Sequence, residues 1–470
     1  MERIAICVDL DGTLLRTDLL YESVLSLLRA NPLFFFALPL WLLRGKANLK
    51  RQIASRVSLV SEVFPTDERV LEYLRGSTNQ TRILCTASDE LLARPIVEHL
   101  GLFDEIIASD GTRNLGGQTK AAELVQRFGE RGFDYMGNSG TDLAVWKHAR
   151  RAWIVNAPAS LAVAASRLTE VAGHLPAQRG GWATWLRAIR IHQWLKNLLV
   201  LVPLLAAHAF LDPAALLSAA LAFASFSLCA SGVYVLNDLL DLPSDRNHPR
   251  KRLRPFAAGD LKIAHGLVAA PLLTVLGFAL AWVCSPAFMA VLAVYYVVTL
   301  AYSLHLKSIH MLDVMMLAAL YTIRIIGGAV AIGVPLSFWL LAFAMFVFLS
   351  LAMLKRYTEL LLVVATSEAK LSGRGYESGD LPLLLAFGGA AGYLSVLVLA
   401  LYIDSPASVD LYSRPQVLWL LCPLLLYWIS RAWSLVRRGR MHDDPVVFAV
   451  TDRVSQVVAL LFLVVVLGAI

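Results

Sequence analysis

Three aspartates in the middle of the chain are the residues best suited to chemistry. Asp238, Asp241 and Asp245 are spaced i, i+3 and i+7, and on a helix this spacing places three carboxylates on one face. Like charges at the end of an apolar segment cost free energy unless a cation neutralises them. With the carbonyl of Asn237 they form a set of hard oxygen ligands that suits Mg²⁺, which also binds substrate phosphates. We therefore expect a metal and diphosphate site here, and the alternative is a solvated loop at a helix end.

Basic side chains near apolar segments form a second set of candidate site residues. Lys251 and Arg254 follow the aspartates closely enough to contact phosphates held there. Lys196 and Arg324 lie at membrane depth along the sequence, and we expect phosphate contacts from them as well. The alternative for both is that the charged group reaches along its own stem to the membrane interface.

Membrane-spanning helices are the elements that must position these residues. Of the 470 residues, 57% are hydrophobic and only 16% are charged, and the apolar excess begins near residue 195. Nine segments are apolar enough, and close enough in length, to be candidate spans. They are residues 197–211, 215–236, 264–283, 287–304, 313–333, 336–354, 382–402, 417–433 and 454–470.

The distribution of Lys and Arg between these spans predicts the orientation. Basic residues are concentrated in alternate connections, which face the cytosol by the positive-inside rule. No cleavable signal peptide is evident, so we expect a multi-pass protein of the cytoplasmic (inner) membrane with a cytosolic N-terminal domain. The same pattern accounts for the net charge of +7, and no nucleic-acid partner is expected.

The sequence NDLLDLPSD, which starts at Asn237, resembles the NDxxDxxxD signature of the UbiA prenyltransferase superfamily. The resemblance covers roughly residues 185–470. It implies an all-α polytopic membrane bundle in which the aspartates hold Mg²⁺ and are catalytic.

A second segment, from Tyr302 to Lys307, is similar to the YxxxLK motif of the same superfamily. Most members complete the metal site with a further Asp cluster after the sixth span. This chain has Lys355, Arg356 and Glu359 there. The exchange of carboxylates for cations favours substrates with more anionic groups than a prenyl diphosphate has.

Further segments resemble one branch, the decaprenyl-phosphate phosphoribosyltransferases. They are residues 190–197, 321–324 and 375–377. The resemblance implies transfer of 5-phosphoribosyl from phosphoribosyl pyrophosphate to a polyprenyl phosphate, with release of diphosphate. The substrate-binding residues that it implies are Lys196, Asn197, Lys251, Arg254, Tyr302, Lys307, Arg324, Lys355, Arg356 and Glu359.

In the N-terminal part, the apolar run Ile4–Val8 predicts a strand that ends in the sequence DLDGT from Asp9. Asp9 and Asp11 then enter a glycine turn, which suits phosphoryl transfer: one carboxylate attacks phosphorus and the other acts as acid and base beside Mg²⁺. The sequence resembles the first motif of the haloacid-dehalogenase (HAD) superfamily. The resemblance covers about residues 1–175 and implies an α/β Rossmann-like fold.

Three more segments follow in the order of the HAD motifs. The resemblance implies that Thr86 and Lys120 bind phosphate and that Asn138 and Asp142 support the metal. The superfamily usually has Asp at the position of Asn138, and a neutral amide should bind the metal more weakly. An active phosphatase and a non-catalytic remnant both stay open.

A helical insertion, roughly residues 17–75, takes the place of the HAD cap. It includes an apolar stretch that starts at Pro32, is too short to span a bilayer, and is followed by Arg44 and Lys46. The stretch suits either a contact with the membrane interface or packing against the helical bundle. The expected domains are 1–178 and 185–470.

The combined prediction is a bifunctional membrane enzyme that uses Mg²⁺. Its partners would be phosphoribosyl pyrophosphate, a polyprenyl phosphate lipid and the membrane, and a homo-oligomer stays open. The HAD domain would remove the ribose 5-phosphate, in a pathway of the cell-wall arabinan precursor type. One alternative is a prenyltransferase that uses a prenyl diphosphate and a hydrophobic acceptor and carries an inactive HAD domain. Another is a transporter or lipid scaffold.

Overall fold

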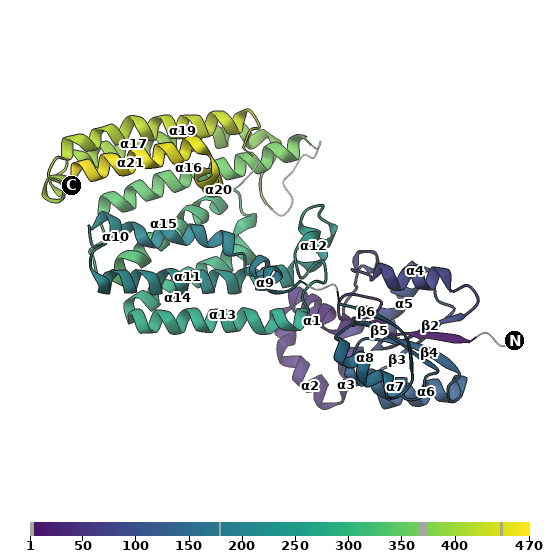
Figure 1. Cartoon of the computed structure of the whole chain (residues 1–470). Helices are drawn as coiled ribbons and strands as arrows, with labels where there is room; N and C mark the ends of the chain where they lie inside the picture. Colours follow the sequence, from purple (N-terminus) through teal and green to yellow (C-terminus); the bar gives the residue numbers. More distant parts are fainter. Residues whose placement is uncertain (1–3, 178–179, 366–373, 442–444) are drawn as a thin grey trace. The chain divides into compact units, whose positions relative to one another are not determined.

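The computed structural model describes residues 4–177, 180–365, 374–441 and 445–470 (Figure 1). The chain divides into two compact units. One comprises Met1–Arg190 and Tyr234–Pro271, and the other comprises Ile191–Val233 and Leu272–Ile470. This differs from the expected division at 178–185, because the structure places the Asp-rich segment in the same unit as the N-terminal residues.

The N-terminal residues form a six-stranded parallel sheet of order β3-β2-β1-β4-β5-β6. The strand predicted at Ile4–Val8 is present as β1. The strands are β1 Ala5–Val8, β2 Thr81–Asp89, β3 Glu105–Ser109, β4 Phe133–Gly137, β5 Arg151–Ala157 and β6 Glu170–Pro176. This order reverses at β1, and ligands bind beyond the carboxyl ends of the strands at such a point.

Helices cover both faces of the sheet because alternate strand residues point to opposite sides. Ile6 and Val8 pack with α4 and α5, whereas Ala5 and Cys7 pack with α6, α7 and α8. The helices of this part are α1 Leu19–Ala30, α2 Ala37–Leu43, α3 Lys46–Ala54, α4 Glu68–Gly76, α5 Glu90–Leu100, α6 Gln118–Phe128, α7 Leu143–Trp146, α8 Ala159–Ser166 and α9 Trp182–Ala188, with short 3₁₀ turns η1 Pro32–Phe36, η2 Ser61–Val63 and η3 Gly140–Asp142.

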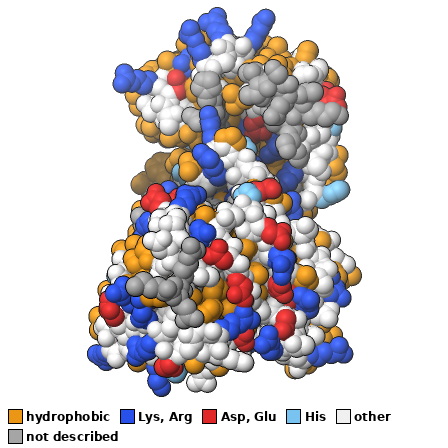
Figure 2. All heavy atoms as spheres, turned by 90° about the vertical axis from the view of Figure 1, so that its right-hand side faces the viewer, with side chains coloured by type: hydrophobic (Ala, Val, Ile, Leu, Met, Phe, Trp, Pro, Cys, Tyr) orange, Lys and Arg blue, Asp and Glu red, His pale blue; other side chains and the backbone are white. Residues whose placement is uncertain are grey.

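On the face drawn in Figure 2, acidic and basic side chains are interspersed over the lower part of the view, and Lys and Arg side chains predominate at its top.

Apolar helices form the rest of the chain. They are α10 Val202–Ala206, α11 Pro213–Leu240, α12 Leu242–Asn247, α13 Ile263–Cys284, α14 Pro286–Leu304, α15 Leu312–Ile332, α16 Phe338–Ala365, α17 Leu381–Ile403, α18 Pro406–Leu411, α19 Leu421–Arg437, α20 Pro445–Thr451 and α21 Arg453–Ala469. The 3₁₀ segments are η4 Ile191–Leu201, η5 Lys251–Leu253, η6 Leu306–Ser308, η7 Ser378–Asp380 and η8 Pro415–Leu420.

Seven helices within the described residues are long and apolar enough to cross a membrane. They include seven of the nine predicted spans. The other two, 197–211 and 454–470, fall on the shorter apolar helices Ile191–Ala206 and Arg453–Ala469. The structure therefore supports an integral membrane bundle, and the count of nine spans stays a prediction.

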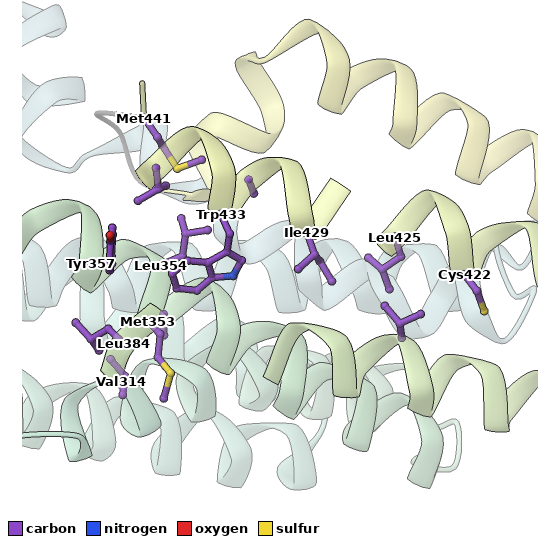
Figure 3. Packing of buried hydrophobic residues seen from close by; sticks show 14 of the residues in the cluster. Val314, Met353, Leu354, Tyr357, Leu384, Cys422, Leu425, Ile429, Trp433 and Met441 are labelled. Atoms are coloured by element: carbon purple, nitrogen blue, oxygen red, sulfur yellow. The ribbon is translucent and has the colours of Figure 1, made fainter. Parts of the chain in front are cut away.

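The bundle packs around a cluster contributed by α15, α16, α17 and α19 (Figure 3). Trp433 of α19 is the largest labelled side chain there, and its indole N–H donates to Ser350 Oγ at 3.1 Å. Glycine at position 388 of α17 lets this ring approach the helix, because a Cβ there would lie 2.2 Å from Trp433 Cζ2.

Gly388→Ala is expected to destabilise the bundle. The added methyl group would overlap the Trp433 ring, and overpacking of this kind costs about 1–3 kcal/mol. Gly389→Ala is the matched control on the same helix, because a Cβ there meets no atom within 4 Å. It should be neutral or stabilise by up to about 1 kcal/mol. Thermal unfolding in detergent checks both, and equal melting temperatures for the two variants would contradict the packing.

Candidate active sites

The sheet brings the predicted phosphoryl-transfer residues together at its carboxyl edge. Asp9 follows β1, and its Oδ1 accepts a hydrogen bond of 2.7 Å from Lys120 Nζ of α6. Asp11 Oδ2 accepts a bond of 2.6 Å from Ser88 Oγ of β2, and its Oδ1 accepts one from Leu19 N. These contacts form because parallel strands deliver their carboxyl ends to one edge.

Asn138 lies against the loop that carries the two aspartates. A Cβ at position 12 would come within 2.0 Å of Asn138 Nδ2, and Gly12 also has φ +76°. Only glycine meets both requirements without strain. The structure therefore places Asn138 next to the predicted metal ligands.

The other two predicted residues make contacts within their own elements. Asp142 Oδ2 accepts from the backbone N–H of Asn138 and of Ser139, and its Oδ1 accepts from Tyr135 Oη at 3.0 Å. Thr86 is buried, and its Oγ1 accepts from Ser88 N. Asp142 thus shapes the turn that presents Asn138.

Burial perturbs the acids of this site. It raises the pKa of Asp9 to about 7, and together with the nearby Asp18 it raises the pKa of Asp11 to about 6. Burial alone lowers the pKa of Lys120, but the surrounding carboxylates outweigh it and raise the pKa. The raised pKa values show that burial disfavours the ionised form of both carboxylates, and a divalent cation beside them would stabilise that form. Carboxylate oxygens are also the ligands that Mg²⁺ prefers, so the residues fit Mg²⁺.

Two of the three aspartates in the Asp-rich segment converge. Asp238 and Asp245 are 2% and 1% exposed, and Arg254 Nη1 lies 3.2 Å from Asp238 Oδ1 and 2.6 Å from Asp245 Oδ2. Arg190 also pairs with Asp238. Guanidinium groups therefore neutralise both carboxylates at the positions that a metal cation would have to take.

Asp241 departs from the expected arrangement of three carboxylates on one helical face. Helix α11 ends at Leu240, and Asp241 is the N-cap residue of α12 with φ −96° and ψ 8°. Among the described residues, no group of three or more His, Cys, Asp and Glu side chains could hold a metal ion by itself. Backbone hydrogen bonds continue across the join of the two helices, from Asp241 N to Asn237 O at 2.9 Å and from Asp245 N to Asp241 O at 2.8 Å.

A buried ionic cluster in the membrane bundle contains Arg356. Its side chain and that of Asp313 are both fully buried, and Arg356 Nη2 lies 2.7 Å from Asp313 Oδ2. Asp313 also accepts a hydrogen bond of 2.5 Å from Tyr376 Oη and one of 3.4 Å from Arg374 Nη1. Burial raises the pKa of the Tyr376 phenol, so the phenol stays protonated and donates.

The cluster holds two cationic and two anionic groups, since Arg356 and Arg374 pair with Asp313 and Glu359. Arg374 Nη1 donates to Tyr302 Oη at 3.2 Å, and its Nε lies 3.7 Å from Glu359 Oε2. Arg356 pairs with Glu359 as well, yet its Nε is buried with no hydrogen-bond acceptor in the described part of the chain. Buried polar groups are nearly always hydrogen-bonded, so this N–H is unusual among the buried side chains of the described residues.

Arg324 is bonded to residues of two neighbouring elements. Its Nε donates to Asn197 Oδ1 at 2.8 Å, its Nη2 donates to Tyr295 Oη at 2.9 Å, and its Nη1 donates to the carbonyl of Leu320. These bonds fix α15 against η4 and α14. The phosphate contact predicted for Arg324 stays untested, and the structure gives the side chain a packing role.

The remaining predicted residues are spread over several elements. Lys196 is buried in η4, and Lys251 is exposed in η5. Asn237, Lys307 and Lys355 are half-buried. Each of these substrate and metal roles stays a prediction.

Sequence reasoning missed residues that only the fold brings into these sites. Ser88 bonds Asp11, and Lys50 of α3 donates to the carbonyl of Ala87 and to Asn114. Arg190 and Arg374 were not assigned to a site although both lie in segments with informative residues. The signal available for them was an Arg next to an apolar span, which also occurs wherever a chain simply follows the positive-inside rule.

Comparison with known proteins defines the class. Residues 198–451 match the UbiA prenyltransferase family, and the chain belongs to that family. It is similar along 96% of its length to the uncharacterized protein y4nM of Sinorhizobium fredii, with 35% identity over 461 residues and 88% of that protein covered. A match of this length includes the sheet domain as well as the membrane bundle.

Two further relatives match 58% of the chain. The nodulation protein NoeC of Azorhizobium caulinodans is 38% identical over 276 residues, which cover 89% of that protein. The decaprenyl-phosphate phosphoribosyltransferase of Mycolicibacterium smegmatis is 33% identical over 283 residues, which cover 88% of it. A solved UbiA homolog from Archaeoglobus fulgidus, bound to GPP and Mg²⁺, aligns with a TM-score of 0.48 at 14% identity, over 61% of this chain and 99% of that one.

Asp11→Asn is expected to stabilise the metal-free protein in a pH-dependent way. The pKa of Asp11 is raised from 3.8 to about 6, so the folded state loses stability as the pH rises through this window and the loss is complete above it. In EDTA the variant should melt roughly 2–6 °C higher at pH 8 and gain less at pH 4.5. Added Mg²⁺ should stabilise the wild type more than the variant, which keeps the carboxylates of Asp238 and Asp245.

Glu62→Gln provides the matched control, since Glu62 is exposed in the same unit. It should leave the melting temperature unchanged at both pH values. A larger gain for Asp11→Asn at pH 4.5 than at pH 8 would contradict the assigned environment.

Proposed function

We propose that the chain is a Mg²⁺-dependent transferase that moves 5-phosphoribosyl from phosphoribosyl pyrophosphate to a polyprenyl phosphate and releases diphosphate. Membership of the UbiA family supports a membrane-bound transferase, and the mycobacterial relatives carry the name of this reaction. The basic connections and the sheet domain would lie on the cytosolic side of the inner membrane.

The buried Arg356 is the observation that carries the choice of substrate. An enzyme for a prenyl diphosphate handles one diphosphate, whereas phosphoribosyl pyrophosphate adds a 5-phosphate and the acceptor adds a lipid phosphate. Extra anionic groups require extra cations. Arg356 and Arg374, with the unsatisfied Nε of Arg356, supply donors suited to them.

The proposed reaction requires the protein to place the two substrates and to neutralise their charges. An ionised oxygen of the lipid phosphate attacks C1 of the ribose, the bond from C1 to the diphosphate oxygen breaks, and no general base is needed. Asp238 and Asp245 would hold Mg²⁺, which when bound neutralises the leaving diphosphate. Arg254 and Arg190, which now pair with these carboxylates, would turn toward the phosphates.

We further propose that the sheet domain is a HAD-type phosphatase that removes the 5-phosphate from the lipid product. Asp9 would attack phosphorus, and Asp11 would donate a proton to the leaving alkoxide and then activate the water that frees Asp9. Lys120, 2.7 Å from Asp9, would bind the phosphate. Two activities in one chain give the second a high effective substrate concentration.

Two observations favour the alternative that the sheet domain is a non-catalytic remnant. Asn138 replaces a carboxylate, and the Asp142 oxygens already accept bonds from their own turn and from Tyr135. A domain that keeps the fold without the activity would explain both. The transferase proposal does not depend on this choice.

Asp245→Asn should abolish diphosphate release from phosphoribosyl pyrophosphate in the presence of Mg²⁺ and polyprenyl phosphate. The loss should be on the order of 10²-fold or more, because a developing charge loses its cation. Asp410→Asn is the control, since this aspartate is exposed on α18. Release from a prenyl diphosphate with an aromatic acceptor, and none from phosphoribosyl pyrophosphate, would identify the alternative prenyltransferase.

Asp9→Asn should cause the 5-phosphorylated lipid to accumulate, because the nucleophile for its removal is lost. Mass spectrometry of the lipid product separates the phosphorylated from the dephosphorylated form. Asp110→Asn is the control on the same domain, at an exposed loop position whose carboxylate bonds only its own turn. A wild-type product that already keeps the 5-phosphate, and is unchanged in the variant, would show that the sheet domain is not this phosphatase.

A further inference from the structure

The cap of the sheet domain presents an apolar segment that neither proposed activity uses. The segment Pro32–Leu43 forms η1 and α2, and none of its residues is buried. Leu33, Phe36 and Leu43 are 70%, 72% and 85% exposed. A contiguous apolar surface of this kind on a folded domain marks an interaction surface.

Its two flanking helices are anchored, so the segment projects from a fixed base. On one side, Arg51 of α3 forms an ion pair of 2.9 Å with Asp89 at the end of β2. On the other side, Glu22 of α1 forms a buried ion pair with Arg246 of the Asp-rich segment. The position of the segment is therefore set by contacts at both of its ends.

The anchor on α1 also fixes the segment near a membrane boundary. Arg29 Nη1, at the end of α1, lies 3.3 Å from the carbonyl oxygen of Leu240. Leu240 is the last residue of α11, one of the helices that can cross the membrane. The apolar segment begins three residues after Arg29, so it starts close to the end of a helix that is long and apolar enough to cross a membrane.

The composition around the segment fits a lipid surface. The Trp41 ring packs 5.8 Å from Phe34, and the Arg56 guanidinium lies 4.9 Å from the Trp41 ring centroid. Arg44 and Lys46, both exposed, follow directly. Tryptophan favours the membrane interface, and cations attract anionic lipid headgroups. The segment is too short to span a bilayer.

We propose that Pro32–Leu43 lies in the bilayer interface, with its apolar side chains among the lipid chains and Arg44 and Lys46 at the headgroups. The segment thereby holds the cap on the membrane surface. This contact rests on the placement of the segment and is independent of the reactions that the two halves perform.

Depth-dependent fluorescence quenching tests the proposal in the full chain. Leu43→Cys, labelled with an environment-sensitive fluorophore, is reconstituted at one copy per lipid nanodisc with anionic lipid. Emission should shift to the blue and fall roughly twofold when quencher-bearing lipids are added, because an interfacial helix buries its apolar face about 5–10 Å deep. The unmodified chain, labelled in parallel, corrects for the five native cysteines.

Val163→Cys on α8 is the matched control, since Val163 is an apolar residue 55% exposed elsewhere on the sheet domain. Its emission should stay water-like and unaffected by the lipid quencher. Water-like emission from position 43 would overturn the proposal. A blue shift at position 43 that lipid quenchers leave unchanged would also overturn it, by showing that protein covers the segment.

A charged variant gives an independent check. Phe36→Glu with Leu40→Glu adds two carboxylates at positions 72% and 62% exposed, so the fold should be retained. Lipid quenching of the label at position 43 should then drop toward the level of the control. Unchanged quenching in a variant that still melts like the wild type would contradict an interfacial position.

Discussion

The buried negative charge of Asp238 and Asp245 is the constraint on which the Asp-rich segment depends. Both side chains are almost inaccessible, and they stand at and just beyond the end of an apolar helix. Leaving two such carboxylates uncompensated would be very costly. Arg190 and Arg254 supply the positive charge in the structure, and a divalent cation with a bound diphosphate would supply it during the proposed reaction.

The same segment is tied to the sheet domain through α1. Arg246, next to Asp245, pairs with Glu22 in an environment where both side chains are 4% exposed. Arg16 and Asp260 add a second ion pair of 2.9 Å. Helix α1 begins at Leu19, whose backbone N–H donates to Asp11. One helix therefore contacts both the residues proposed for phosphoryl transfer and the segment proposed for the transferase.

Much of the fold followed from the sequence because its signals are local. The apolar run that ends in DLDGT predicted a strand, and the structure has β1 there, within a parallel sheet. Membrane-spanning segments were found by length and hydropathy. The bounds of the short helices at both ends of the bundle were harder to predict, because an apolar run close to the length of a span does not show where the helix begins and ends.

The sequence indicated which residues could belong to a site, but it did not indicate which of them contact one another. The spacing of the three aspartates predicted a cluster of carboxylates, and the described residues contain no group of three such side chains that could hold a metal ion. The pairing of Arg356 with Asp313 joins residues on two different helices, which no spacing rule could reveal. Arg324 shows the converse, since a basic residue at membrane depth turned out to be bonded to Asn197 and Tyr295.

A cation shared by the Asp-rich carboxylates and a diphosphate is the central claim, and Mn²⁺ in place of Mg²⁺ tests it most directly. The full chain with Asp9→Asn and Asp11→Asn, which removes the ligands of the soluble site, would be loaded with Mn²⁺ and phosphoribosyl pyrophosphate. Electron–nuclear double resonance should then detect ³¹P coupled to the bound Mn²⁺, and Asp238→Asn with Asp245→Asn should abolish it. A ³¹P coupling that survives loss of both carboxylates, or bound Mn²⁺ without any ³¹P coupling, would contradict the account.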